Sequence, residues 1–446
     1  MASFTRYSTK EEDTSEEGEL ESEDDGDSGG ESFLTDEEEF VPDEDFDDSQ
    51  QDDEEPSTSS GGQDASPPAE EPSTLPAGKD ASPPAEELNT APAGQANIMT
   101  RDRYQVISWN IHMSDPEEDV ENDRKKGTPD HDRLFRLKLL LDTIKNACLA
   151  YYHPRQNLAI DERMVATKAH TGMTQHMKAK PIRWGFKLFV LADSSNGYTV
   201  DFTVYTGKSQ FVSGVGLAYD SVMSLMNKEY LGSGFHLYVD NFYTSSKLFK
   251  DLFSLNVGAC GTYRGNRKDF PHTDSNALKK NAPRGSIRWI REGPLVFVKW
   301  MDTREVSICS TIHPAFSGNT VKRRVKTRGS EWTTKCIPCP TPIGEYNRHM
   351  GGVDMSNQLI QYYSVHHKSM RWYRTLFFHF LDIAATNSYL LHKELCREKK
   401  EEPMSHRDFL QELTAQLCGV TVKTPPGQTH SSHVPVAIAE ILDELL

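Results

Sequence analysis

The feature that most constrains how this chain can fold is an abrupt change in composition near residue 97. Residues 1–96 contain 31 Asp and Glu against three Lys and Arg, whereas residues 97–446 contain 36 acids and 46 bases. The first segment is also rich in Ser and Pro and poor in apolar residues, so it cannot bury enough apolar surface to fold. We therefore expect a disordered acidic tail over residues 1–97 and a folded body after it.

Charge also bears on the partners of the two segments. The body has ten more bases than acids, which is modest support for a nucleic-acid partner. The acidic tail has two open interpretations: a solvated chain, or a docking segment for a protein partner. No apolar run reaches the roughly 18 residues that a membrane span needs, and the first residues lack the apolar core of a signal peptide, so no membrane partner is expected. Seven scattered cysteines favour a reducing compartment.

Hydrophobic periodicity predicts an α/β core interrupted by a strand-rich segment. Helices are expected over residues 132–152, 214–230 and 245–255, and strands over residues 157–164, 185–193, 197–207, 235–244 and 257–267. Residues 271–345 alternate like an antiparallel meander and end in a proline-rich connection. A single long helix is then expected from residue 354 to about residue 399.

Three acids stand at notable positions in this pattern. Asp161 follows the strand "NLAI", Asp240 ends the strand "FHLYV", and Asp354 opens the last helix after two glycines. Each has an ordinary structural interpretation, namely a solvated turn at Asp161–Glu162, a turn that begins at Asp240, and a helix N-cap at Asp354. Ligand sites in open α/β sheets lie beyond the carboxyl ends of strands, however, and the three acids could meet there.

Together, the acids and the bases that follow them fit phosphodiester chemistry. Carboxylates are the hard oxygen ligands of Mg²⁺ and Mn²⁺, and two such ions can hold the attacking and leaving oxygens of a displacement at phosphorus. Basic side chains would hold the phosphate backbone. A cluster of basic residues follows each acid, and the third cluster also contains a tryptophan. The clusters are Lys180, Arg183 and Lys187 after Asp161; Arg264, Arg267 and Lys268 after Asp240; and Lys368, Arg371 and Trp372 after Asp354.

Ordered motifs along the body resemble the piggyBac transposase family. They are "NLAIDERM", "KPIRWGFKLFVLAD", "GYTVDFTVYTG", "LYVDNFYTSSKLFKDL", "GTYRGNRKDFP" and "EYNRHMGGVDMSNQLIQYYS", followed by "RWYRTLFFHFLDIAATNSY". The resemblance covers roughly residues 98–400. It implies an RNase H-like catalytic core interrupted by a strand-rich insertion domain, and Mg²⁺- or Mn²⁺-dependent excision and insertion of DNA at TTAA sites. The family's catalytic acids match Asp161, Asp240 and Asp354, which would hold two metal ions in an active enzyme.

The chain also departs from the family pattern. The family has a second Asp three residues after the "GGVD" acid, where this chain has Asn357, an uncharged fourth metal ligand at best. Lys168, a further expected DNA contact, is followed by Ala169 instead of the family's Gly-Arg. Much of the family's N-terminal dimerisation and DNA-binding region is expected to be missing, as is its cysteine-rich zinc domain. No zinc is therefore expected, and "CIPC" is not interpreted as a zinc site.

These expectations divide the chain into a disordered tail (1–97), a truncated helical dimerisation and DNA-binding region (98–155), a first core part (156–270), an insertion domain (271–345), the last core helices (346–400) and a helical C-terminal tail (401–446). Two functions remain open. One is a DDE-type enzyme that binds DNA as a homodimer or monomer, with impaired transposition. The other is a domesticated, non-catalytic DNA- or chromatin-binding protein. Either is expected in the nucleus.

Overall fold

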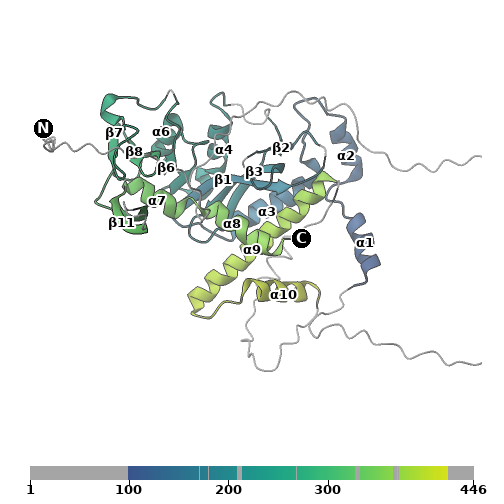
Figure 1. Cartoon of the computed structure of the whole chain (residues 1–446). Coiled ribbons are helices and arrows are strands. Elements are labelled where there is room, and N and C mark those ends of the chain that lie inside the picture. Colours follow the sequence, from purple (N-terminus) through teal and green to yellow (C-terminus); the bar gives the residue numbers. More distant parts are fainter. Residues whose placement is uncertain are drawn as a thin grey trace, which may run out of the picture. The chain divides into compact units, whose positions relative to one another are not determined.

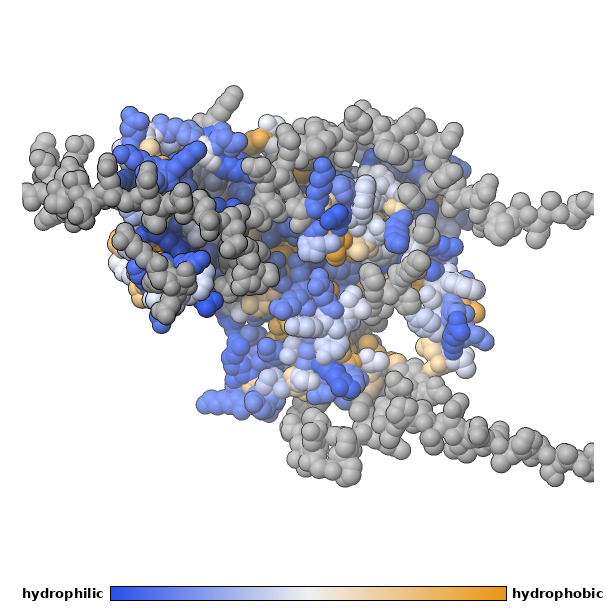
Figure 2. Space-filling view, viewed as in Figure 1, coloured by the Kyte–Doolittle hydropathy of each residue, from blue (hydrophilic) through white to orange (hydrophobic). Residues whose placement is uncertain are grey.

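The computed structural model describes residues 99–169, 171–178, 180–207, 213–267, 269–326, 332–364, 369 and 371–419 (Figure 1 and Figure 2). The predicted acidic tail lies outside these residues. So do Lys268 and Lys368, two of the expected DNA contacts. None of the described helices is long and apolar enough to cross a membrane.

The described fold is built on one large mixed sheet. Its strands are β1 (Asn157–Ala166), β2 (Thr174–His176), β3 (Trp184–Asp193), β4 (Thr199–Val204), β5 (His236–Val239), β6 (Gly258–Thr262), β7 (Ile287–Glu292), β8 (Leu295–Met301) and β9 (Glu305–Ser310). They run in the order β2-β3-β1-β5-β6-β9-β8-β7, and β4 pairs with the same edge of β3 as β2 does. The predicted α/β class is confirmed, and the predicted strands are present.

The core of this sheet has the RNase H-like arrangement. β1, β3 and β4 form an antiparallel meander, and β1 is followed in space by β5 and β6, which run parallel to it. The parallel pairs are connected through helices, as such pairs require. β3 is buried along almost its whole length, which explains its nearly unbroken apolar sequence "FKLFVLA".

Helices cover both sides of the sheet. In the view of Figure 1, α4 (Leu217–Leu225) and α6 (Ser246–Ser254) lie above it, and α8 (Gly352–Tyr363) and α9 (Trp372–Lys399) lie below. Ser245 caps α6 by accepting a hydrogen bond from the Leu248 amide. The remaining helices are α1 (Arg101–Trp109), α2 (Pro116–Asp123), η1 (Phe135–Leu137), α3 (Lys138–Ala150), α5 (Lys228–Leu231), η2 (Asp274–Asn276), α7 (Thr341–His349) and α10 (His406–Leu417).

The strand-rich segment 271–345 extends the core sheet. β9 pairs antiparallel with β6, so β7, β8 and β9 continue the same sheet outward. Only β10 (Thr320–Lys326) and β11 (Trp332–Pro338) form a separate two-stranded sheet. Part of the proline-rich connection expected here is therefore a strand, β11.

The last helical segment differs from its prediction. The expected single helix over 354–399 is two helices, α8 and α9, because the backbone of Ser364 is extended and ends α8. The Ser364 hydroxyl donates a hydrogen bond to Asp382 on α9, at 2.8 Å, which holds the two helices together at the break. A further helix, α7, precedes α8 and was not predicted, because Pro342 in its first turn and Pro340 at its N-cap suggested an irregular connection.

Candidate functional site

Strand pairing brings two of the predicted acids together. β1 and β5 are parallel neighbours, with Ile160 opposite Val239, so the next residues, Asp161 and Asp240, lie side by side. Asp161 is in the middle of β1, because the strand continues to Ala166. The interpretation of Asp161 as part of a solvated turn is therefore wrong. Asp240 does begin a turn, since one of its carboxylate oxygens accepts a hydrogen bond from the Phe242 amide at 2.9 Å.

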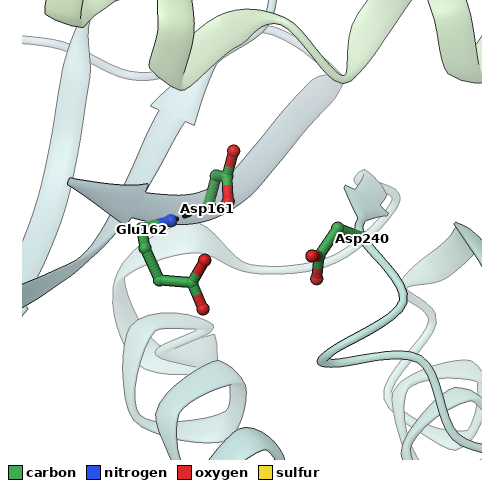
Figure 3. Close-up of side chains that lie close together, drawn as sticks. All are labelled: Asp161, Glu162 and Asp240. Atoms are coloured by element: carbon green, nitrogen blue, oxygen red, sulfur yellow. Dashed lines mark hydrogen bonds between the residues drawn. The ribbon is translucent and has the colours of Figure 1, made fainter. Parts of the chain in front are cut away.

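A third carboxylate, on Glu162, completes the cluster. One oxygen from each of Asp161, Glu162 and Asp240 lies within 4.8 Å of the others. Figure 3 shows the Asp161 and Glu162 side chains leaving β1 on opposite sides, with the Asp240 carboxylate turned toward β1. Glu162 was not among the predicted site residues, because it was considered only as part of a solvated turn. The adjacent "DE" pair was the available signal.

The three carboxylates repel one another in a poorly solvated place. Burial raises the pKa of Asp161 well above its usual value, and the neighbouring charges of Glu162 and Asp240 raise it further. Burial, followed by the charge of Glu162, raises the pKa of Asp240 to about 6. A nearby cation stabilises the ionised form of such carboxylates. A divalent metal ion would supply the positive charge that compensates their repulsion.

Two lysines partly neutralise this cluster. Lys187 Nζ lies 3.3 Å from one oxygen of Glu162, and Lys180 Nζ lies 4.0 Å from the other. The acids of the site raise the pKa of Lys180 against the opposing effect of its burial. Both lysines were predicted as DNA contacts. The structure places both lysines against the acids, and Lys187 also lies 4.8 Å from the centre of the Phe242 ring; their contacts with DNA stay a prediction.

Asp354 approaches the cluster from α8. It is the third residue of that helix and is exposed, so the interpretation of Asp354 as the N-cap is wrong; the N-cap is Gly351. Asp354 is outside the group of oxygens that converge within 4.8 Å. Its charge nevertheless contributes to the raised pKa of Lys180, which also interacts with Asp161, Glu162 and Asp240.

A glycine allows α8 to lie this close to the sheet. A Cβ atom on Gly352 would lie 3.1 Å from Ser194 Cα and 3.2 Å from the Asp193 carbonyl oxygen, both backbone atoms that cannot move aside cheaply. A Cβ on Gly351 would meet nothing within 4 Å. Gly352, the second glycine of "GGVD", is therefore the one that leaves room for the backbone of the sheet. Its small size lets the first turn of α8, which carries Asp354, lie close to the sheet.

Asn357, the predicted fourth ligand, is engaged elsewhere. Its side-chain oxygen accepts a hydrogen bond from Arg163 Nε, and the neighbouring Ser356 hydroxyl accepts one from Arg163 Nη2 at 2.7 Å. Arg163 is only 3 % exposed, and no carboxylate pairs with it in the part of the chain that the structure describes. Burial lowers its pKa to about 9. A carboxylate at position 357 would face this buried cation.

The other predicted DNA contacts fall into two groups. Arg267 donates hydrogen bonds to the carbonyl oxygens of Asn241, Phe242 and Thr244, so it holds the turn after Asp240 in place. Arg264 donates to the side chain of Asn241 at 3.2 Å. The rest lie at or near the surface: Lys168, Arg183 and Arg371 are exposed, and Trp372 is half-buried against the core.

The donor set fits a hard divalent cation. All the converging atoms are carboxylate oxygens, the ligands that Mg²⁺ and Mn²⁺ prefer. An acid within one strand of an RNase H-like sheet, an acid just after the adjacent parallel strand and a further acid on a covering helix define the class of DDE transposase domains. Similarity to known proteins gives the family within that class.

A family model described as Transposase IS4 matches residues 86–389, more than half of the chain. The chain belongs to this DDE transposase family, in its piggyBac-type branch. It is 25% identical over 339 residues to human piggyBac transposable element-derived protein 3, covering 74% of this chain and 54% of that protein. It is 27% identical over 324 residues to human piggyBac transposable element-derived protein 2, covering 71% and 52%.

The fold also matches a solved structure. A chain in the cryo-EM structure of the piggyBac transposase synaptic complex with hairpin DNA superposes with a TM-score of 0.63 at 21% identity, covering 78% of this chain and 68% of that one. The expected RNase H-like core is thereby confirmed as a fold. The chain spans about half the length of the curated relatives that it matches.

Proposed function

We propose that this protein binds DNA and that its acid cluster holds divalent metal ions for cleavage or strand transfer at DNA phosphodiester bonds. The observation that carries the proposal is the convergence of Asp161 and Asp240, with Glu162, at neighbouring strands of the RNase H-like sheet. DNA as the partner is supported by the family and by the solved relative, which was captured with hairpin DNA. A nuclear location follows from a DNA partner, and a homodimer remains part of the proposal.

Each residue of the site has a role in this proposal. Asp161, Asp240 and Asp354 would ligate Mg²⁺ or Mn²⁺, which when bound lowers the pKa of a water nucleophile and stabilises the charge on the leaving oxygen. Lys180, now among the acids, is placed to contact a phosphate oxygen once metal ions neutralise the carboxylates. Arg267 keeps the turn after Asp240 fixed, so the carboxylate is held in one orientation.

A second function is favoured by one specific observation. Asn357 leaves Arg163 buried without a carboxylate, whereas the family pattern has an acid at this position. The family pattern has a negative charge at position 357 that this chain lacks, and a site with one carboxylate fewer should bind a divalent ion more weakly, because a unit charge about 4 Å from the ion interacts by up to ~4 kcal/mol at an effective dielectric of 20. A non-catalytic DNA-binding protein that retains the fold is the corresponding alternative.

Cleavage of labelled duplex DNA with a TTAA site distinguishes the two functions. The purified full chain is incubated with Mg²⁺ or Mn²⁺, beside the Asp240→Asn and Asn357→Asp variants. The proposal predicts cleavage that requires metal and that Asp240→Asn abolishes. Cleavage only by Asn357→Asp identifies Asn357 as the inactivating residue, and DNA binding without cleavage in any form supports the alternative.

A further inference from the structure

We infer that the β10–β11 hairpin is a second DNA-contacting surface, a β-ribbon that holds the phosphate backbone of a duplex. The inference rests on the proposed function in one respect, since it takes DNA as the partner. It concerns residues outside the acid cluster, and it requires neither metal nor cleavage. The basic run "VKRRVK" lies in β10.

The pairing of the two strands gives the ribbon one open face. In an antiparallel pair, residues directly opposite each other project to the same side. Along β10, every second residue is exposed, and the residues opposite them on β11 are exposed too. The open face is made of Lys322, Arg324 and Lys326 and, directly opposite them, Cys336, Thr334 and Trp332.

The other face of the ribbon is attached to the protein around Val321 and Ile337, whereas Thr333 and Lys335 on the same face are exposed. Ile337 is buried, and Val321 packs against the same cluster of apolar residues, which includes Trp300 of β8. Arg323 also belongs to this face, and its Nε lies 3.0 Å from a carboxylate oxygen of Asp302. The attachment fixes the orientation of the ribbon, so the cations of the open face are presented outward.

Among the residues that the structure describes, the cations of the open face have no acidic partners. Lys322, Arg324 and Lys326 form no ion pair within the described residues, although Arg323 between them does. The Arg324 guanidinium lies 5.9 Å from the centre of the Trp332 ring, whose side chain is 62% exposed. An indole beside a guanidinium limits the rotamers of both, so less entropy is lost when the Arg meets a phosphate.

The spacing and charge of this face suit a duplex backbone. Alternate residues of a strand are about 6.7 Å apart, close to twice the 3.4 Å axial rise per phosphate of one DNA strand. A two-stranded ribbon also fits the width of the major groove.

The first test is the salt dependence of duplex binding by the full chain in EDTA, where no cleavage takes place. The variant Lys322→Gln/Arg324→Gln/Lys326→Gln removes three charges from the ribbon. Its matched control, Lys138→Gln/Lys247→Gln/Lys250→Gln, removes three exposed lysine charges from α3 and α6. We expect the ribbon variant to reduce the slope of log K against log salt by about 2–3 and to weaken binding at least about tenfold at 0.1 M salt. The control should resemble the unmodified protein.

The second test needs no substitution. Cys336 lies on the open face, and Cys418, near the end of α10, is the other exposed cysteine among the described residues. Bound duplex should slow iodoacetamide alkylation of Cys336 severalfold and leave the alkylation rate of Cys418 unchanged, as measured by mass spectrometry.

A second control belongs to the salt-dependence test. The charge-preserving variant Lys322→Arg/Arg324→Lys/Lys326→Arg should bind duplex like the unmodified protein, so that substitution at these positions is not itself the cause of a loss.

Three results would overturn the inference. They are an unchanged salt slope in the ribbon variant, an equal loss in the control variant, and alkylation of Cys336 at the same rate with and without DNA. The proposed function fails separately. If the unmodified protein binds no duplex at all, DNA is not the partner and both proposals fall, whereas DNA binding without metal-dependent cleavage refutes only the catalytic one.

Discussion

Replacing Asn357 with Asp should stabilise the metal-free protein. Arg163 is a buried cation that donates to Asn357 and Ser356, two neutral acceptors. Arg163 Nη1 has no hydrogen-bond partner among the described residues. His379 Nε2 has none there either, and burial together with the charge of Arg163 lowers the pKa of His379. The cation is therefore under-compensated, and a carboxylate at position 357 would face it directly.

The expected gain follows from the geometry of this contact. A hydrogen bond between neutral groups contributes about 1 kcal/mol, and one assisted by opposite charges roughly twice that. Coulomb attraction at about 4 Å adds up to ~4 kcal/mol at an effective dielectric of 20, and desolvation of the new carboxylate offsets most of it. Because Asn357 is half-buried, we expect a net rise of about 1–2 kcal/mol in the free energy of unfolding.

Urea denaturation in EDTA at pH 7.5 measures this change, and a thermal melt should show a rise of a few degrees. Asn357→Leu is the matched control: it keeps the approximate volume and removes the acceptor, so it should lower the free energy of unfolding by about 2 kcal/mol. If Asn357→Asp leaves stability unchanged or lowers it, Arg163 is already compensated in the folded protein, and the reasoning is refuted.

Two further predictions concern the same site. The raised pKa of Asp240 means that the folded metal-free protein binds more protons than the unfolded chain between about pH 4 and pH 6, so stability falls as the pH rises through this range. In EDTA, Asp240→Asn should flatten this profile and add about 1–2 kcal/mol at pH 7, and a profile unchanged by the substitution would contradict the assignment. Gly352→Ala should lower the free energy of unfolding by about 1–3 kcal/mol, because the new methyl group meets the backbone at Ser194. Gly351→Ala should be nearly neutral, and equal effects of the two in urea denaturation would show that close packing of α8 is not the cause.

Much of the core could be predicted from local patterns. The nearly unbroken apolar run of β3 and the Ser245 cap of α6 are signals within a few residues, and both are present in the structure. The pairing of Asp161 with Asp240 was also foreseeable, because acids at the ends of parallel strands meet at one edge. These features depend on periodicity and on strand direction, which a sequence displays.

Other features depend on contacts between distant residues. The attachment of Asn357 to Arg163 joins α8 to β1 and leaves no local trace. The break at Ser364 is compensated by Asp382, 18 residues later, so helical periodicity continued through it. The contact of Lys187 with Glu162 is of the same kind, because it depends on the register of β3 against β1; the phosphate contact expected of Lys187 stays a prediction.

Metal binding tests the central claim most directly. Titration of Mn²⁺ into the metal-free full chain, followed by the electron paramagnetic resonance signal of the free ion, measures the affinity without requiring DNA or activity. Asp161→Asn/Asp240→Asn should abolish tight binding. The control Asp142→Asn/Asp251→Asn, which removes two acids paired with lysines on α3 and α6, should leave it unchanged. Equal Mn²⁺ affinity in the Asp161/Asp240 variant and the unmodified protein would contradict the assignment of this cluster as a metal centre.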